Sequence, residues 1–443
     1  MTTPPASTTA DADAVARAYT RLSDFLRARG ERDGARDALE RAVTERADDP
    51  QRHFALAHFL ERCNLVDAAG VAAAEGLRLA PRHPELSLVM ARVDRRRGRL
   101  ADALSTLERI DVPGLPSRVA RAITFERGHV RDGLEDVDGA WADYVAGNAL
   151  AAAEVRALRI DPERFLARAF PDPDEWAPSA AAGPDAGGQP VFLVGFPRSG
   201  TTLIEQILDS HPDIHTLSEI PAVQALHDDV AARADGQTVL DVSPVDAERL
   251  RAQYWHTIGG GPGMSTARVV IDKLPLNIVH LPLIHRVFPG ARILFAQRHP
   301  LDVCLSCFTQ DFELNAAMAN FTSLEATAQL YARVMAIWQT YATRCAPQVH
   351  VIRYERLVTD FESEVRMALD FLGVGWHDGV RDFAAHARAR GEIQTPSYHQ
   401  VVQPLHDRSI GRWRPYARHL AGVRDRLVPI AESFGYTDAW SGA

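Results

Sequence analysis

The sequence has little cysteine, with four residues in 443. So few cysteines cannot form a disulfide framework, and a reducing compartment suits them best. Only Cys304 and Cys307 lie close together, and no second pair exists to complete a zinc site. The 17 histidines include no H-E-x-x-H pattern. We therefore expect no metal in the site.

Long hydrophobic runs are also missing. Nowhere does the sequence contain an uninterrupted apolar stretch of the roughly 18 residues that a membrane-spanning helix needs. Residues 1–13 have neither the basic region nor the apolar core of a signal peptide. We expect a cytoplasmic protein with no membrane partner.

The sequence also lacks an excess of basic residues. The 49 lysines and arginines against 58 aspartates and glutamates give a formal net charge of −9. This balance argues against a nucleic-acid binder but leaves room for a local anion site. With 46% hydrophobic and 24% charged residues, the composition is that of an ordinary globular protein. The length predicts two domains, or one domain with a repeat array.

What the sequence does contain is a 34-residue period over its first 115 residues. Three series recur at this spacing: the small residues Ala35, Ala69 and Ala103, the apolar residues Leu22, Leu56 and Met90, and the bulky residues Phe25, Phe59 and Val93. Each unit is predicted to form two helices that approach closely at the small residue and pack on the next unit through the apolar series. A fourth, less regular unit is expected at 117–150, with Ala140 as its small residue. The pattern resembles the tetratricopeptide repeat, whose arrays present a concave surface to a peptide or to another domain. An array that serves only as a packing spacer is the alternative.

The composition changes after residue 170. Residues 171–189 are rich in alanine, glycine and proline and are expected to form a linker. From residue 190 onward, β-branched runs alternate with helical segments, which predicts a mainly parallel sheet flanked by helices. We therefore expect tetratricopeptide-type helical repeats over 1–170 and an α/β domain over 190–443.

A strand, a loop and a helix follow one another between residues 191 and 210. In such a unit the backbone N–H groups of the loop and the positive end of the helix dipole point at one place, which favours an anion. The residues expected to hold it are Pro197, Arg198, Ser199, Gly200, Thr201 and Thr202. A purely structural turn is the alternative.

The loop departs from the Walker pattern G-x-x-x-x-G-K-[ST] at one position. Gly195, Gly200 and Thr202 occupy its glycine and hydroxyl places, but Thr201 stands where the lysine should be. Because that lysine reaches the β- and γ-phosphates of a triphosphate, its absence argues against an enzyme that consumes ATP or GTP. Asp272, after three apolar residues, resembles a Walker B acid, and it supports a P-loop kinase as the alternative function.

The run from residue 192 to 212, FLVGFPRSGTTLIEQILDSHP, resembles the 5′-phosphosulfate loop of sulfotransferases that use 3′-phosphoadenosine 5′-phosphosulfate. The whole chain resembles bacterial tetratricopeptide-repeat sulfotransferases, and its catalytic half is similar to protein-tyrosine sulfotransferases. The resemblance implies a P-loop-like α/β domain that transfers a sulfonyl group to a hydroxyl acceptor and releases 3′,5′-phosphoadenosine, without a metal. A peptide or protein tyrosine and a hydroxylated small molecule both stay open as acceptors.

The resemblance also implies roles for residues near the ends of later strands. Arg298 and Ser306 match residues that hold the 3′-phosphate, and Lys273 matches a lysine that lies against the transferred sulfonyl group. Glu219 matches the glutamate that serves as base. Arg198 would help to stabilise the charge that builds on the leaving phosphate. Strand-end salt bridges or solvated positions are the alternatives for these residues.

Three positions in the last third of the chain complete the expected site. Tyr354 matches a position near the nucleotide, with core packing as the alternative, and Ser397 matches a serine that reaches the phosphosulfate. Gln403 stands where the tyrosylprotein enzymes have a lysine, and either Arg408 or Arg412 could replace that charge. A non-catalytic binding protein whose repeats do the work is the third functional hypothesis.

Overall fold

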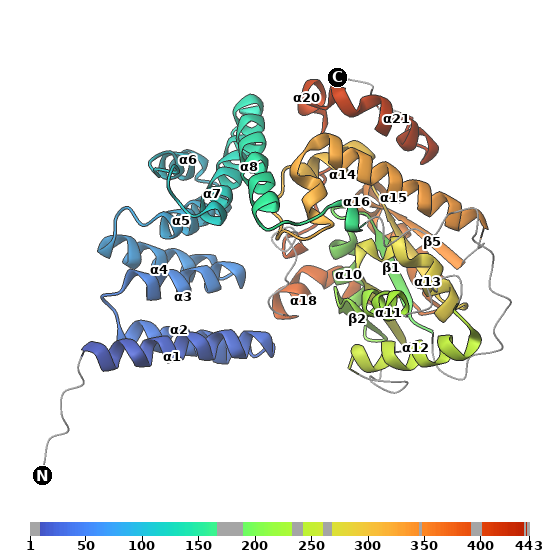
Figure 1. Cartoon of the computed structure of the whole chain (residues 1–443), viewed down its shortest axis with the longest axis horizontal. Helices are drawn as coiled ribbons and strands as arrows, with labels where there is room; N and C mark the ends of the chain where they lie inside the picture. Colours follow the sequence, from blue (N-terminus) through green and yellow to red (C-terminus); the bar gives the residue numbers. More distant parts are fainter. Residues whose placement is uncertain are drawn as a thin grey trace, which may run out of the picture. The chain divides into compact units, whose positions relative to one another are not determined.

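The structure is a computed structural model of the chain (Figure 1). The residues it describes are 9–165, 189–232, 242–259, 268–344, 348–390, 401–437 and 440. They separate into two compact units, one made of the residues up to Arg156 with a short segment from Arg388, the other of the remaining residues. The expected linker at 171–189 lies outside the described residues apart from Gln189.

Helices that follow one another in pairs form the first unit over its described residues (Figure 1). The pairs are α1 (Thr9–Ala28) with α2 (Arg32–Glu45), α3 (Pro50–Arg62) with α4 (Val66–Leu79), α5 (Pro84–Arg96) with α6 (Leu100–Glu108), and α7 (Ser117–Gly133) with α8 (Val137–Ala157). Pro50 and Pro84 both stand in the first turn of a helix, where the missing N–H group costs no hydrogen bond. Each predicted 34-residue unit therefore forms one helix pair, and so does the predicted fourth unit.

Small side chains at one repeat position let the two helices of a pair touch. The four predicted small residues, Ala35, Ala69, Ala103 and Ala140, are all completely buried. Phe59 is buried as expected, but Phe25 at the same repeat position is 57% exposed. Phe25 lies on α1, and no described helix precedes α1 to cover this face.

A five-stranded parallel sheet forms the centre of the second unit. The strands are β1 (Val191–Gly195), β2 (Ile214–Ser218), β3 (Val269–Lys273), β4 (Arg292–Gln297) and β5 (Gln348–Arg353), in the order β2-β3-β1-β4-β5. The order reverses direction at β1, with β3 on one side and β4 on the other. Open parallel sheets bind ligands at the carboxyl ends of the strands where this reversal occurs.

Helices follow the strands, because parallel strands need crossover connections. They include α10 (Thr201–Asp209), α11 (Ala222–Ala231), α12 (Pro244–Thr257), α13 (Leu281–Val287), α14 (Pro300–Phe308), α15 (Leu324–Arg344), α16 (Tyr354–Thr359), α17 (Phe361–Leu372), α18 (Phe383–Arg390), α20 (Ala417–Leu420) and α21 (Arg424–Ser433). The predicted fold class, a helical array followed by an α/β domain with a parallel sheet, is confirmed.

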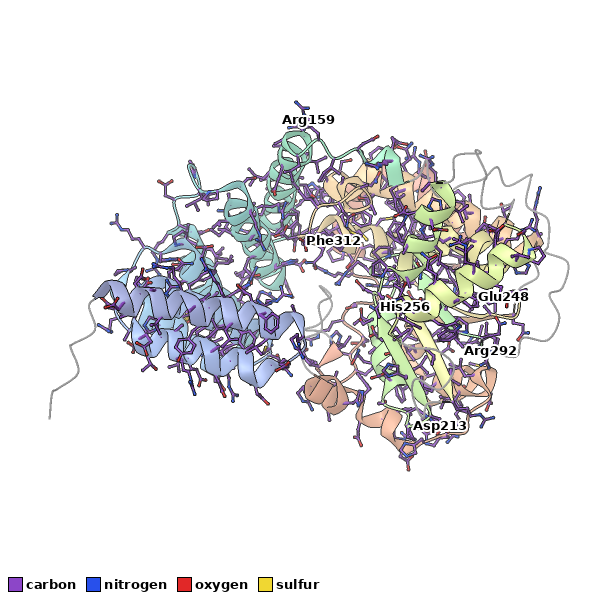
Figure 2. The ribbon with its side chains drawn as sticks, turned by 60° about the horizontal axis from the view of Figure 1, so that its bottom comes forward. Arg159, Asp213, Glu248, His256, Arg292 and Phe312 are labelled. Atoms are coloured by element: carbon purple, nitrogen blue, oxygen red, sulfur yellow. The ribbon has the colours of Figure 1, made fainter. Side chains whose placement is uncertain are left out.

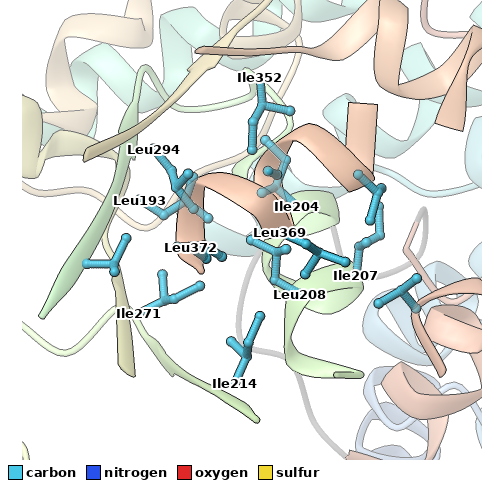
Figure 3. Packing of buried hydrophobic residues seen from close by; sticks show 14 of the residues in the cluster. Leu193, Ile204, Ile207, Leu208, Ile214, Ile271, Leu294, Ile352, Leu369 and Leu372 are labelled. Atoms are coloured by element: carbon cyan, nitrogen blue, oxygen red, sulfur yellow. The ribbon is translucent and has the colours of Figure 1, made fainter. Parts of the chain in front are cut away.

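Both faces of the sheet are covered by apolar side chains. On one face Leu193 of β1 packs with Ile207 of α10 and Leu372 of α17 (Figure 3). On the other face the ring of Phe295 in β4 stacks on Trp338 of α15, with 4.1 Å between centroids. Because successive residues of a strand point to opposite faces, strands buried on both sides read as continuous apolar runs. In the described part of the chain, no helix combines the length and the apolar character needed to cross a membrane.

Candidate functional site

The predicted site residues stand at the carboxyl ends of all five strands. They are the loop 196–200 after β1, Glu219 after β2, Lys273 at the end of β3, Arg298 after β4 and Tyr354 after β5. Since the strands are parallel and in register, these ends meet along one edge of the sheet. Asp213 and Arg292, labelled in Figure 2, stand instead at the amino ends of β2 and β4. Sheet topology thus gathers side chains that are far apart in the sequence.

The loop between β1 and α10 has a backbone that depends on glycine. Gly200, the residue before α10, has a φ of +101°, and a Cβ atom there would lie 2.7 Å from the ring of Tyr354. A Cβ atom on Gly195 would lie 2.9 Å from the backbone oxygen of Ala296. Arg198 also adopts a positive φ, of 70°. The left-handed residues fold the loop tightly against the N-terminus of α10, where the positive end of the helix dipole lies.

Two arginines meet beside this loop. The Nε of Arg198 donates to the Oγ of Ser306 at 3.0 Å, and Nη1 of Arg298 donates to the backbone oxygen of Arg198 at 3.0 Å. The guanidinium of Arg298 also lies over the ring of Tyr354, 4.7 Å from its centroid. Burial, together with the nearby guanidiniums of Arg298 and Arg412, lowers the pKa of Arg198 to about 10. Positive groups crowded in this way favour an anion between them.

A pocket with about 510 Å³ of space, part of it open to solvent, lies at the same place. Its lining residues are Arg198, Gly200, Thr202, Leu203, Arg298 and Tyr354 from the strand ends, and Val401, Pro404, Leu405 and His406 from the C-terminal segment. Among the lining residues, two buried polar atoms, Arg298 Nε and His406 Nδ1, have no hydrogen-bond partner in the described part of the chain. Buried polar atoms are normally satisfied, so both can receive a ligand.

The C-terminal segment 409–413 is fastened to the start of α14. Nη2 of Arg298 donates to the backbone oxygen of Ser409 at 2.5 Å. The buried carboxylate of Asp302 accepts the backbone N–H groups of Gly411, at 2.8 Å, and Trp413, at 2.9 Å. Sequence reasoning missed Asp302, and its only signal was an acidic residue in the first turn of a helix, which is common.

The C-terminal region also contains the two arginines that could replace the lysine charge expected at Gln403. Arg408 donates to the Oε1 of Gln403 at 3.4 Å. Arg412 lies close enough to Arg198 to lower its pKa. The replacement of the expected lysine charge by Arg408 or Arg412 stays a prediction.

Lys273 is completely buried between two carboxylates. Its Nζ lies 2.7 Å from Oε1 of Glu219 and 3.0 Å from Oε2 of Glu205. Glu205, on α10, is also completely buried, whereas 39% of the Glu219 side chain is exposed. The backbone N–H of Glu219 donates to the oxygen of Lys273 at 2.8 Å. The structure thus joins the predicted base to the predicted lysine and adds Glu205, which the sequence gave no reason to single out.

Asp272 faces away from the phosphate loop. It is completely buried, accepts the hydroxyl hydrogen of Tyr254 at 2.9 Å and does not line the pocket. Burial raises its pKa to about 7. The position of Asp272 therefore removes the main sequence support for a magnesium-dependent kinase.

The remaining predicted residues have mixed outcomes. Thr201 and Thr202 begin α10 and are buried, and Ser306 is buried on α14. Cys304 and Cys307 are buried on α14, and the thiol of Cys307 donates to the backbone oxygen of Pro197 at 3.3 Å. Ser397 lies outside the described residues. In the described part of the chain, no group of three or more His, Cys, Asp or Glu side chains is arranged to hold a metal ion.

Comparison with known proteins supports the resemblance. Residues 190–378 match the model of the Sulfotransferase family. An uncharacterized protein of Aquifex aeolicus (strain VF5) is 26% identical over 331 residues, which cover 72% of this chain and 43% of that protein. Protein-tyrosine sulfotransferase 2 of Gallus gallus is 26% identical over 269 residues, 56% of this chain and 69% of that protein. Protein-tyrosine sulfotransferase of Drosophila melanogaster is 24% identical, over 56% of this chain and 51% of its own length.

Among solved structures, the sulfotransferase domain of the Synechococcus PCC 7002 olefin synthase aligns with 58% of this chain and 99% of its own, at 20% identity and a TM-score of 0.39. The chain spans about half of the Aquifex and Drosophila relatives. For its C-terminal part, the predicted sulfotransferase resemblance is confirmed by the family match.

Proposed function

We propose that the second unit, whose residues 190–378 match the sulfotransferase family, transfers a sulfonyl group from 3′-phosphoadenosine 5′-phosphosulfate to a hydroxyl acceptor. One observation carries this proposal. Two charged groups of side chains contact the segment formed by the phosphate loop and α10, one built on Arg198 and Arg298, the other on Lys273 with its two carboxylates. The first group suits the anionic donor, and the second suits the acceptor hydroxyl.

The donor would be held by the loop and by Arg298. The phosphosulfate would bind the N–H groups of residues 197–202, and the 3′-phosphate would bind Arg298 and Ser306, because a guanidinium fork and a hydroxyl match a phosphate. The free Nε of Arg298 and the adjoining pocket support this assignment. When bound, the donor supplies an activated sulfonyl group with phosphoadenosine as its leaving group.

Glu219 would act as the base. As the acceptor oxygen forms its bond to sulfur, the bond between sulfur and the leaving phosphate oxygen breaks, and the hydroxyl proton passes to the carboxylate of Glu219. Glu219 suits this role because part of its side chain is exposed, whereas Glu205 and Lys273 are completely buried. Arg198 would stabilise the charge that develops on the leaving phosphate.

Glu205 would act as a positioning residue. When Glu219 takes the proton it loses its negative charge, and Lys273 would then have no carboxylate partner without Glu205. A buried ammonium without a counter-ion is costly. Glu205 would therefore keep Lys273 in place through the transfer. Because Lys273 is completely buried, we expect it to reach the transferred group only when the side chain of Glu219 turns toward the acceptor.

The acceptor that we propose is a tyrosine of a peptide or protein. Two relatives are named protein-tyrosine sulfotransferases, and the helix pairs of the first unit suit the binding of a peptide. A hydroxylated small molecule is the alternative acceptor.

A thermal-shift titration tests the donor site. The full chain is titrated with 3′,5′-phosphoadenosine and, separately, with ATP and magnesium. A ligand at about 100 times its dissociation constant should stabilise the fold by roughly 2.7 kcal/mol. We expect this response for phosphoadenosine in the wild type, its loss in Arg198→Ala and its retention in Arg292→Ala, which removes an arginine from the opposite end of β4. Stabilisation by ATP and magnesium alone would reject the proposal in favour of a kinase.

A transfer assay tests the base. With labelled donor and a tyrosine peptide, Glu219→Gln should reduce kcat by about 100-fold or more, because general-base catalysis contributes 10²- to 10⁴-fold. Phosphoadenosine should still stabilise this variant. Transfer at the wild-type rate by Glu219→Gln would show that another group takes the proton.

A further inference from the structure

One side of the proposed donor pocket is formed by residues 401–413, which we call the late segment. Val401, Pro404, Leu405 and His406 line the pocket, and residues 402–413 make turns rather than regular helix or strand. A stretch of this kind has no backbone ladder of its own, so its backbone groups depend on partners from neighbouring elements. The contacts that fix the late segment therefore bear on the shape of the pocket.

The end of β4 and the first turn of α14 hold the late segment. Nη2 of Arg298 donates to the backbone oxygen of Ser409 at 2.5 Å. Next to it, the ring of His299 stacks on the ring of Trp413, with 5.6 Å between the centroids. The Trp413 side chain is almost completely buried. The short stretch that contains Arg298, the predicted ligand of the 3′-phosphate, therefore also holds the late segment.

Asp302 makes the most specific of these contacts. Its Oδ2 accepts the backbone N–H of Gly411 and its Oδ1 accepts that of Trp413, and the residue is only 1% exposed. Hydrogen bonds to an ionised carboxylate are roughly twice as strong as those between neutral groups. Gly411 has a φ of +66°, which lets the chain turn between the two bonds. Both oxygens of Asp302 thus bind the backbone of the late segment.

A carboxylate at this place is electrostatically unfavourable for an anionic donor. Burial raises the pKa of Asp302, whereas the nearby guanidinium of Arg298 and the two backbone N–H groups act in the opposite direction. Asp302 therefore lies close to the arginine that would bind the 3′-phosphate, and like charges repel. Electrostatics alone gives no reason for an acid here, but its two bonds to the late segment do.

We propose that Asp302 is a positioning residue of the donor site, which holds the late segment against the bound nucleotide through the backbone of Gly411 and Trp413. Asp302 does not itself line the pocket, so it acts on the donor through this segment. The proposal rests on the proposed function, because it takes the pocket to be the donor site. An anchor that serves stability alone is the alternative, and its loss would leave the affinity of the folded protein for the donor unchanged.

Isothermal titration calorimetry of the full chain with 3′,5′-phosphoadenosine tests the proposal, at a temperature at which circular dichroism shows each variant to be folded. Asp302→Asn replaces one acceptor oxygen by an amide, so one of the two backbone bonds is lost. We expect its dissociation constant to rise about fivefold, because the loss of repulsion offsets only part of the lost bond. Gly411→Ala keeps the charge of Asp302 but strains the backbone at a φ of +66°, and it should weaken binding about threefold.

Asp209→Asn and Gly373→Ala are the matched controls from the same unit. Asp209 of α10 accepts the backbone N–H of Thr216 at 2.8 Å, and Gly373 has a φ of +72°. Neither residue lines the pocket. Both control variants should bind phosphoadenosine with the affinity of the wild type.

The results separate a failure of this proposal from a failure of the proposed function. Unchanged or tighter binding by Asp302→Asn would overturn the proposal, and so would equal weakening by Asp209→Asn. If Asp302→Asn does not fold, Gly411→Ala decides, and an affinity equal to that of Gly373→Ala would overturn the proposal. No binding by the wild type would instead reject the donor site, and the positioning role with it.

Discussion

The two carboxylates that contact Lys273 differ in burial, and this difference predicts unequal effects on stability. Glu205→Gln and Glu219→Gln each remove one negative charge next to the same ammonium group. Glu205 is completely buried, and 39% of the Glu219 side chain is exposed. Removing one partner of a buried ion pair costs about 3–5 kcal/mol, whereas an exposed pair contributes about 0–1 kcal/mol. We expect Glu205→Gln to lower the free energy of unfolding by about 3 kcal/mol and Glu219→Gln by less than about 1 kcal/mol.

Urea unfolding followed by tryptophan fluorescence measures this difference. Trp141 is the one tryptophan in the sequence of the first unit. In a Trp141→Phe background the fluorescence therefore reports the unfolding of the second unit. At pH 7 the urea midpoint of each variant is compared with the midpoint of the Trp141→Phe protein. The shift in midpoint measures a change in stability when the dependence of the unfolding free energy on urea is the same in both proteins.

Two results would refute this reasoning. If Glu219→Gln destabilised the unit as much as Glu205→Gln does, burial would not decide the strength of these pairs. If Glu205→Gln had no effect, Lys273 would not depend on Glu205. As a further check, Lys273→Met combined with Glu205→Gln should cost less than the sum of the two single changes, because contacting residues are coupled.

Three further predictions concern other positions. Burial raises the pKa of Asp272 from its ordinary value of 3.8 to about 7 in the native state. Between these pH values the native state therefore binds more protons than the unfolded state, and the free energy of unfolding falls as the pH rises through this range. Asp272→Asn should remove this contribution, which amounts to about 3 kcal/mol between pH 5 and pH 8 in urea unfolding. Gly200→Ala should abolish most of the phosphoadenosine thermal shift, because φ is +101° and the new Cβ would meet Tyr354; an unchanged shift would count against the loop as donor site. Ala69→Leu should destabilise the repeats by about 1–3 kcal/mol in circular-dichroism melting, and a wild-type melting curve would contradict the close helix approach.

Sequence patterns could predict the features that repeat or that are local. The 34-residue period predicts the helix pairs because each unit repeats the same packing, seen in the burial of Ala35, Ala69 and Ala103. The phosphate loop is predictable because Gly195 and Gly200 stand where the backbone leaves no room for a side chain. Strand-end residues such as Arg298 are predictable because parallel strands end at one edge.

Contacts between distant parts of the sequence could not be predicted in the same way. Glu205 reads as an ordinary helical residue, and only the packing of α10 against the sheet brings it to Lys273. Asp302 reads as an acidic residue in a first helical turn, while its partners Gly411 and Trp413 lie more than a hundred positions later. Asp272 was misleading because the local pattern does not say which face of the sheet a side chain occupies.

Alternation along β3 has a consequence for how this domain can change during evolution or engineering. Asp272 and Lys273 are neighbours in the sequence but serve opposite sides of the sheet, the first bonded to Tyr254 and the second to the glutamates at the strand edge. Deleting or inserting one residue within β3 would exchange these sides and bring an acid to the place of the ammonium. The length of β3 is therefore constrained, so natural or designed variation in length belongs outside this strand.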